Sequence, residues 1–164
     1  MQKGPEYFIR AAKKVVEYNP KTLFVVAGSG DMQESMIAEA SYLGIMDKVM
    51  FTGFLRGDEK NKIYQAADVY VMPSVSEPFG ITPLEAIANG PPVLVSKQSG
   101  VSEVLNNVLK TDFWDVDDMA DKILAILKYK SLTSDLRNES GKELPNINWD
   151  EAAKKTIGIY KQLI

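Results

Sequence analysis

The chain has 164 residues, a formal net charge of −3 and 45% hydrophobic residues, values that are ordinary for one soluble globular domain. It contains neither Cys nor His, which excludes disulfides, thiolate or histidine metal sites, and catalysis by Ser-His-Asp or Cys-His arrangements. No basic block supports nucleic-acid binding, and no apolar run approaches the roughly 18 residues of a membrane span, so we expect a cytoplasmic protein.

Helix-like and strand-like segments alternate along the first half of the chain. Apolar residues recur with helical spacing from Phe8 to Val16, and Asn19-Pro20 ends that helix. The apolar run Thr22–Ala27 predicts a strand that is buried on both faces of a parallel sheet. The next predicted elements are a helix over 32–43 with Gly44 as its C-terminal cap, a strand over 48–52, and a helix over 58–67 with Asp58 as its N-cap.

The alternation continues through the second half. Val69–Met72 is a predicted buried strand, and the helix over 82–89 has Thr82 as its N-cap, Pro83 at its start and Gly90 beyond its end. The remaining predicted elements are a strand over 93–95, a short helix over 102–105, a weak strand over 108–110, and helices over 117–128, 132–143 and 149–164, the last capped by Asn148.

Repeated strand–helix units of this length predict an α/β fold with a Rossmann-like, doubly wound parallel sheet, in a single domain spanning 1–164. In such sheets, ligands bind at the loops that leave the carboxyl ends of the strands. The glycine- or proline-containing loops at these positions are 28–31, 53–57, 73–81 and 96–100.

The loop over 73–81 has the most unusual composition. The carboxylate of Glu77 follows the strand directly, and the amides of Gly80, Ile81 and Thr82 are expected to be free where the next helix begins. Free amides at the positive end of a helix suit a phosphate, and a carboxylate beside them suits the hydroxyls of a sugar.

A purely structural interpretation of the same residues is also open. Glu77 would then be a solvated loop residue, and Glu85 would be a first-turn acid favoured by the helix dipole.

The segment from Ala67 to Val93 reads ADVYVMPSVSEPFGITPLEAIANGPPV. It resembles the signature of family-4 glycosyltransferases, which belong with glycogen synthases and sucrose-phosphate synthases among the retaining GT-B enzymes. The resemblance continues in KG at 3–4, VVAGSG at 25–30, FTGF at 51–54 and SKQSGVSE at 96–103, so it covers nearly the whole chain in the family's order.

The resemblance implies a C-terminal donor domain that binds a UDP-, ADP- or GDP-linked sugar. Glu77, together with the amides of Phe79 and Gly80, would hold the hydroxyls of the donor sugar, and Lys3 would contact the pyrophosphate. Glu77 and Lys3 are therefore the candidate catalytic residues.

The resemblance also implies the nucleotide end of the site. The amides of Ile81 and Thr82 would bind the diphosphate, and Glu85 would bind the ribose hydroxyls. Phe54 and Leu55 lie in the loop that borders the base in this family.

Gly28 and Gly30 are expected to form a strand-to-helix turn that borders the donor. Their spacing could suggest a dinucleotide fingerprint, but Gln33 stands where the third glycine should be. The acids of another segment, Asp115, Asp117, Asp118 and Asp121, are interpreted as helix-start residues rather than a metal cage. The family needs no bound metal or other cofactor. Trp114 and Trp149 are expected to be packing residues.

One element of the family's donor domain has no counterpart in this sequence. That element is a strand ending in Gly-Arg a few residues before Lys3, and it would lie between Thr22–Ala27 and Val69–Met72. We therefore expect a gap at the centre of the sheet, self-association of the chain, and a C-terminal helix over 148–164 that packs toward an absent acceptor domain.

The implied reaction is transfer of a hexosyl group from the nucleotide sugar to a carbohydrate or other hydroxyl acceptor, with retention of anomeric configuration. The isolated chain is expected to be inactive because the acceptor half is absent. Two alternatives stay open: a non-catalytic module that binds nucleotide sugars, and a glycosidase that uses two carboxylates. A glycosidase needs no nucleotide and a binding module turns nothing over, so activity assays separate the three.

Overall fold

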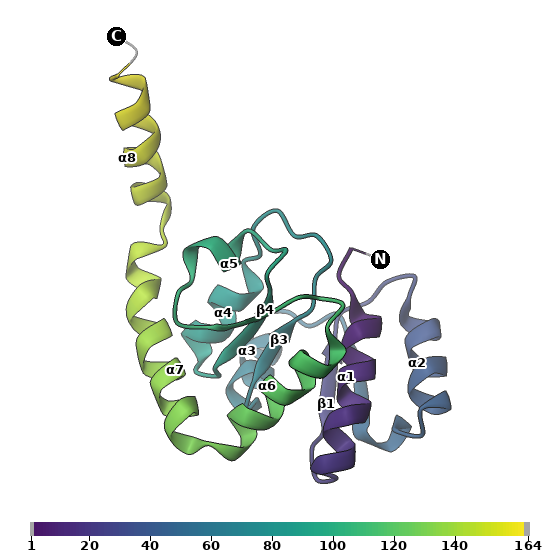
Figure 1. Cartoon of the computed structure of the whole chain (residues 1–164). Coiled ribbons are helices and arrows are strands. Elements are labelled where there is room, and N and C mark those ends of the chain that lie inside the picture. The colour runs from purple at the N-terminus through teal and green to yellow at the C-terminus, as the bar shows by residue number, and fades with distance from the viewer. Residues whose placement is uncertain (1, 163–164) are drawn as a thin grey trace.

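The computed structural model describes residues 2–162, in which helices and parallel strands alternate (Figure 1). The strands are β1 (Phe24–Ala27), β2 (Val49–Gly53), β3 (Tyr70–Met72), β4 (Val93–Ser96) and β5 (Leu109–Thr111). The α-helices are α1 (Pro5–Tyr18), α2 (Gln33–Tyr42), α3 (Gly57–Ala66), α4 (Thr82–Asn89), α5 (Val101–Val104), α6 (Val116–Lys128), α7 (Lys130–Glu143) and α8 (Trp149–Tyr160). Short 3-10 turns, η1 (Met46–Lys48) and η2 (Leu144–Asn146), precede β2 and α8. The predicted α/β order is confirmed.

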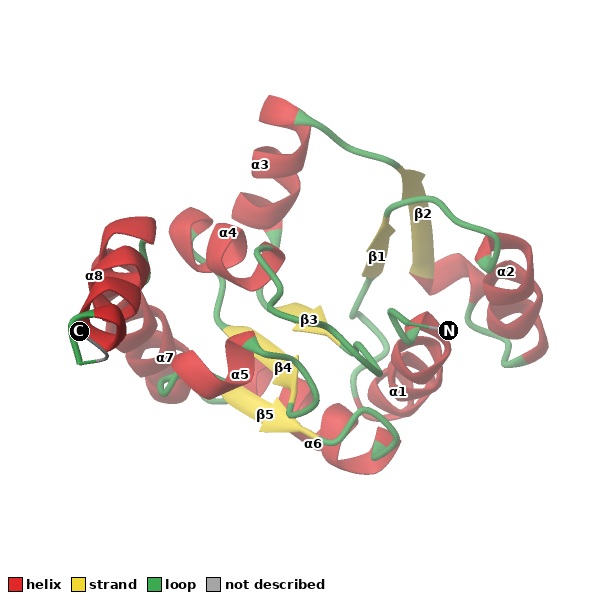
Figure 2. Ribbon diagram, turned by 90° about the horizontal axis from the view of Figure 1, so that it is seen from above, coloured by secondary structure: helices red, strands yellow, loops and turns green. Residues whose placement is uncertain are grey.

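The strands form two separate parallel sheets. One sheet pairs β1 with β2, and the other has the order β3-β4-β5. Strands β1 and β3, which the sequence places on either side of an absent strand, are not paired with each other (Figure 2). The doubly wound sheet is therefore interrupted at the predicted place.

Helices on both faces hold the two sheets in one molecule. On one face, α1, α2 and α6 cover a core that reaches both sheets, because Phe24 of β1 and Leu94 of β4 belong to the same buried cluster as Ile9 of α1 and Ile123 of α6. On the other face, α3, α4 and α5 cover the three-stranded sheet in a second cluster that includes Tyr64, Ala86 and Val101 of those helices and Val93 and Val95 of β4. Both clusters consist mainly of aliphatic side chains, whose burial is the dominant stabilising contribution to such a fold.

The prediction that Thr22–Ala27 is buried on both faces is wrong. Phe24 is buried, but Val25 is 38% exposed, and its cross-strand neighbour Met50 is 60% exposed. Because side chains alternate across a strand, only one face of the β1–β2 sheet contacts helices. The sequence pattern of a fully buried strand is present, but the second covering layer is absent among the described residues.

Helix ends follow the sequence at three of five predicted caps. Gly44 and Gly90 adopt left-handed φ angles of 68° and 113° just beyond α2 and α4, and the Asn148 side chain accepts a hydrogen bond from the Glu151 amide at 2.9 Å. Asp58 and Thr82 were predicted as N-caps, and both predictions are wrong. Each of these residues already lies inside its helix, so its side chain is past the position from which it could cap the helix start.

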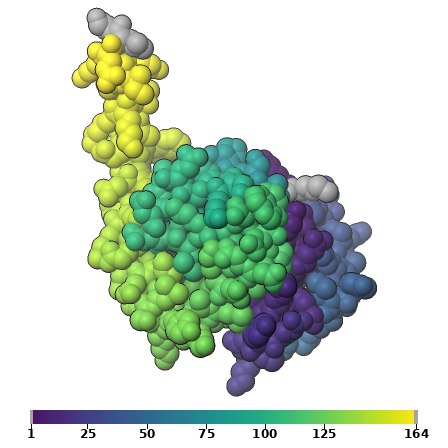
Figure 3. Space-filling model, in the orientation of Figure 1, coloured from purple at the N-terminus to yellow at the C-terminus, as the bar shows by residue number. Residues whose placement is uncertain are grey.

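The C-terminal helix α8 extends away from the body of the molecule (Figures 1 and 3). None of its residues is buried, and Trp149 is 87% exposed, so the prediction that Trp149 packs in a core is wrong. The apolar side chains of Ile157, Ile159 and Tyr160 are also more than half exposed. Across residues 2–162, no helix has the length and hydropathy needed to cross a membrane.

Candidate functional site

The loop between β3 and α4 is held in place by the loop that follows β4. The amide of Gly100 donates to the Glu77 carbonyl at 2.9 Å, and the amide of Val101 donates to the Phe79 carbonyl at 2.7 Å. A Cβ atom at residue 100 would lie 2.1 Å from the carbonyl oxygen of Pro78, so this close approach requires glycine. The two backbone bonds fix the chain on both sides of Pro78.

A backbone hydrogen bond and an ion pair hold the start of the chain against the same loop. The carbonyl of Gln2 accepts a hydrogen bond from the Val75 amide at 3.0 Å, and Gly4 has a φ of 59° that glycine adopts readily. The Nζ atom of Lys3 then forms an ion pair with Oε2 of Glu77. The Glu77 side chain is only 15% exposed, against 67% for Lys3, so the cation lies on the solvent side of a mostly buried carboxylate.

The amides at the start of α4 lack a partner in the described part of the chain, and three of the four residues that carry them, Phe79, Ile81 and Thr82, are exposed, whereas Gly80 is buried. Among residues 2–162, the N–H groups of Phe79, Gly80, Ile81 and Thr82 donate to no protein acceptor. Gly80 has a φ of 99°, which turns the chain sharply into the helix. Unpaired amides at the positive end of the helix dipole form a favourable site for an anion.

Glu85, in the first turn of α4, is held by two residues of α3. Its Oε1 atom accepts from Nζ of Lys60 at 2.7 Å, and its Oε2 atom accepts from the Tyr64 hydroxyl at 3.3 Å. Lys60 and Tyr64 are four residues apart, so they lie on the same face of α3. The side chains of Glu85 and Lys60 are 32% and 36% exposed, which leaves the pair accessible at the surface.

Tyr64 and Tyr70 contact each other and form hydrogen bonds with Glu85 and Thr82 at the start of α4. The Tyr70 hydroxyl donates to Oγ1 of Thr82 at 2.8 Å, and the Tyr70 ring contacts the Tyr64 ring edge-on with centroids 5.6 Å apart. Burial raises the pKa of Tyr70 to about 12 and also raises the pKa of Tyr64. Both hydroxyls therefore remain protonated at neutral pH and act as hydrogen-bond donors.

The other residues predicted to border the donor nucleotide sugar lie in loops at the ends of the two-stranded sheet. The Gly28 amide donates to the Gly53 carbonyl at 2.7 Å, which joins the loop carrying Gly28 and Gly30 to the loop carrying Phe54 and Leu55. Phe54 is 66% exposed, and the guanidinium of Arg56 lies 5.2 Å from the centre of its ring. Within residues 2–162, no hydrogen bond or ion pair joins these loops to the loop over 73–81.

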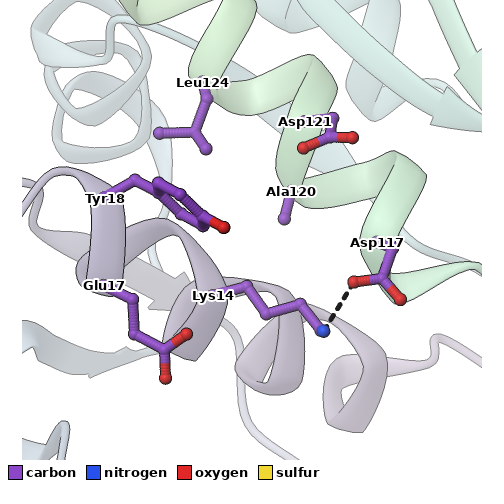
Figure 4. A pocket seen from close by; sticks show the side chains of 7 residues that line it. All are labelled: Lys14, Glu17, Tyr18, Asp117, Ala120, Asp121 and Leu124. Carbon is purple, nitrogen blue, oxygen red and sulfur yellow. Dashed lines mark ion pairs between the residues drawn. The ribbon is translucent and has the colours of Figure 1, made fainter.

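A small pocket of about 110 Å³ lies elsewhere, between α1 and α6 (Figure 4). Lys14 of α1 pairs with Asp117 of α6 across it at 2.5 Å, and no predicted site residue lines it. Of the nearby acids, Asp115 is the N-cap of α6, accepting from the Asp118 amide at 2.9 Å. No group of three acidic residues in the described chain has the arrangement of a metal site.

Four residues of the site region were not predicted from sequence: Lys60, Tyr64, Tyr70 and Gly100. The spacing of Lys60 and Tyr64 does place them on one helix face, but it does not say which element that face meets. Gly100 lies in the loop over 96–100, which the sequence predicts to lie near a ligand. Its close contact with Pro78 could not be predicted, because that contact depends on how two loops meet in space.

Comparison with known proteins identifies the family. The model of the family described as "Glycosyl transferases group 1" matches residues 1–143. An uncharacterised glycosyltransferase of Methanocaldococcus jannaschii is 39% identical over 98% of this chain and 42% of its own length. A D-inositol 3-phosphate glycosyltransferase of Corynebacterium urealyticum is 31% identical over 98% of this chain and 40% of its own length.

The fold is found in solved structures as well. An Anabaena protein, HepE, solved with UDP and glucose superposes with a TM-score of 0.84 over 99% of this chain, at 20% identity and over 46% of its own chain. The chain thus spans less than half the length of these relatives. From the family match and the shared α/β fold, the chain belongs to the glycosyl transferases group 1 family.

Proposed function

We propose that this chain binds the nucleotide-sugar donor of a retaining hexosyltransferase. The observation that carries the proposal is the group of unpaired amides at the start of α4, flanked by the Lys3–Glu77 ion pair on one side and by Glu85 on the other. Amides and a lysine suit a diphosphate, and carboxylates suit the hydroxyls of two sugars. The Anabaena structure with UDP and glucose supports this class of ligand.

Each group has a role in this proposal. Glu77 and the amides of Phe79 and Gly80 hold the hydroxyls of the donor sugar, while the amides of Ile81 and Thr82 hold the diphosphate. As the glycosidic bond breaks, negative charge grows on the leaving nucleoside diphosphate, and the amides and Lys3 stabilise it electrostatically. The acceptor hydroxyl attacks from the face that the diphosphate leaves, which retains the anomeric configuration.

The nucleoside occupies the rest of the site in the same proposal. Glu85 accepts hydrogen bonds from the ribose, the base lies beside Phe54 and Leu55, and the turn containing Gly28 and Gly30 borders the donor. This arrangement uses only groups of the chain and involves no cofactor.

Saturation-transfer NMR with UDP-, GDP- and ADP-sugars tests the ligand class and identifies the base. The role of the amides is tested by Ile81→Pro, because the φ of Ile81, −75°, suits proline while the substitution removes one N–H group. Ile81→Ala is the matched control, since it keeps the amide and shortens a side chain that is 62% exposed. We expect binding to weaken in the proline variant alone. Equal affinity of the two variants would contradict a diphosphate at the helix start.

We further propose that the acceptor is bound by a separate domain, and that the isolated chain transfers sugar far more slowly than a complete enzyme. In this proposal residues 1–164 hold the donor, while the separate domain orients the acceptor and helps to exclude water from the reaction. Turnover near an ordinary enzymatic rate of about 1 s⁻¹ by residues 1–164 alone would contradict this. Hydrolysis of a glycoside in the absence of any nucleotide would instead indicate a glycosidase.

A further inference from the structure

The ion pair between Lys60 and Glu85 joins two helices next to the proposed nucleotide site. Lys60 lies on α3 and Glu85 in the first turn of α4, 25 residues later, and Nζ and Oε1 are 2.7 Å apart. Tyr64, one turn after Lys60, donates to the other carboxylate oxygen at 3.3 Å. Each oxygen of Glu85 therefore has one side-chain partner from α3.

This arrangement fixes the orientation of the carboxylate plane. The terminal torsion of a glutamate is broad, so an unpartnered carboxylate samples many orientations. Partners on both oxygens restrict that rotation. An ionised carboxylate has about four acceptor positions, and two of them remain here, one on each oxygen. Two neighbouring hydroxyls, such as those of a ribose, can each donate to one of the remaining positions.

Lys60 also changes the charge that a bound nucleotide meets. Glu85 is in the first turn of the helix whose amides are proposed to bind the diphosphate, so an isolated carboxylate there would repel the phosphates. The Lys60 ammonium group neutralises that charge at the position where it arises. The pair thus permits a carboxylate to serve as a hydroxyl acceptor beside an anionic ligand.

We propose that Lys60 is a positioning residue that acts through Glu85, and that the preference of this chain for a nucleotide with ribose hydroxyls depends on it. This inference rests on the proposed function. It differs from direct contact of Lys60 with a phosphate, which would be insensitive to the ribose hydroxyls. It also differs from a purely structural link between α3 and α4, which would affect stability without affecting the choice of ligand.

The experiment compares two ligands across a set of variants by isothermal titration calorimetry on the full chain. The ligands are the nucleoside diphosphate that binds most tightly among UDP, GDP and ADP, and its 2′,3′-dideoxy counterpart. The variants are Lys60→Met, Lys60→Arg and the matched control Lys62→Met. Lys62 lies on the same helix, is exposed, and has no hydrogen bond or ion pair within residues 2–162.

We expect Lys60→Met to weaken binding of the ribonucleotide by about 5-fold, since a partly exposed ion pair contributes modestly. Binding of the dideoxy ligand should weaken less than about 2-fold, because it meets only the solvent-screened charge of Glu85 and has no ribose hydroxyls to lose as hydrogen-bond donors. Lys60→Arg should restore most of the loss, and Lys62→Met should bind as the unmodified chain does. Melting temperatures identify any variant whose fold is damaged, and for such a variant the ratio of the two affinities remains the deciding measurement.

Three results would overturn the inference. Equal losses for both ligands would show that Lys60 acts only on the charge that the phosphates meet and not on ribose recognition. No loss for either ligand would show that Lys60 has no role in binding. A Lys60→Met variant that loses affinity and is not rescued by Lys60→Arg would show that a cation at this position is insufficient. If the unmodified chain binds none of the three nucleotides, the proposed function itself fails. If it binds them and loses ribose preference in Glu85→Gln but not in Lys60→Met, only the present inference fails.

Discussion

Lys3 and Glu77 form an ion pair although 74 positions separate them in the sequence. The contact is made because the backbone at Gln2 bonds to Val75 and the backbone at Gly100 bonds to Glu77. A mostly buried carboxylate and an exposed ammonium group are thereby placed together beside the free amides of α4. The pair joins the two residues that the resemblance implies as catalytic.

The two carboxylates beside α4 are expected to differ in what they recognise. Glu85→Gln should weaken binding of the nucleoside diphosphate itself by about 1–3 kcal/mol, the contribution of a hydrogen bond to a charged group. Glu77→Gln should leave nucleotide affinity unchanged and reduce discrimination among sugars attached to the same nucleotide. Calorimetry with the free nucleotide and with a panel of its sugars measures both effects. If the two variants lose the same affinity for the free nucleotide, the assignment of Glu77 to the sugar is wrong.

Gly100→Ala is expected to disrupt the two backbone hydrogen bonds, from Gly100 and Val101, that hold the loop over 73–81. The added Cβ atom would lie 2.1 Å from the carbonyl oxygen of Pro78, so the backbone must move. The hydrogen bonds from the amides of residues 100 and 101 must then lengthen. We expect a loss of about 1–3 kcal/mol in unfolding free energy, as for other overpacked sites, together with weaker nucleotide-sugar binding.

Gly141→Ala is the matched control for this substitution. Gly141 lies inside α7, and a Cβ atom there meets nothing within 4 Å. The control should gain up to about 1 kcal/mol, because alanine is the better helix former. Urea unfolding measures both variants, and unchanged stability of Gly100→Ala would show that the two loops separate without cost.

The unpaired edges of β1 and β3 predict poor solubility or self-association of the chain. Each backbone group left without a partner in apolar surroundings costs about 1–3 kcal/mol, so the edges favour any added strand. Because Gln2 is bonded to Val75 at the carboxyl end of β3, a designed strand placed before residue 1 can enter this gap parallel to its neighbours. Such an extension should give a monomer with a higher melting temperature.

Sedimentation velocity and thermal unfolding compare the two chains. A third chain, residues 1–147, separates the contribution of the sheet edges from that of the exposed apolar side chains of α8. The chain of residues 1–147 should still self-associate if the unpaired edges of β1 and β3 cause the association. A monodisperse, thermally stable monomer of residues 1–164 would contradict the predicted effect of the interrupted sheet.

Asp118 provides a pH-dependent contribution to stability. Its carboxylate is partly desolvated, which opposes ionisation, but hydrogen bonds from Lys122 and Thr111 outweigh this, and the pKa of Asp118 lies below its usual value. A lowered pKa means that the stabilisation is complete above the unfolded value of about 3.9 and is lost as the pH falls through the lower folded value.

Asp118→Asn should therefore be less stable than the unmodified chain at pH 7, by about 1 kcal/mol or less for a partly exposed pair. The difference should shrink as the pH falls below about 4. Urea unfolding at several pH values measures it, with Asp121→Asn on the same helix as the control. A difference that stays constant with pH would show that Asp118 acts through something other than its charge.

Local patterns in the sequence determined most of the secondary structure. Helical spacing and the Asn19-Pro20 stop predicted α1 closely, and Gly90 and Asn148 marked one helix end and one helix start where the structure has them. These features succeed because spacing, caps and breakers act through neighbours a few residues apart. The fold class followed from the alternation of the elements, and the family followed from the order of its motifs.

Only the tertiary structure decided which residues meet and which faces are covered. The exposure of Val25 and Met50 could not be predicted, because their apolar pattern is the same whether or not a second layer covers them. The partners of Glu85 could not be predicted either. Lys60 and Tyr64 reach it only because α3 and α4 pack side by side, and the contact joins positions more than twenty residues apart. A sequence specifies local preferences directly, whereas contacts between distant residues depend on how all the elements pack together.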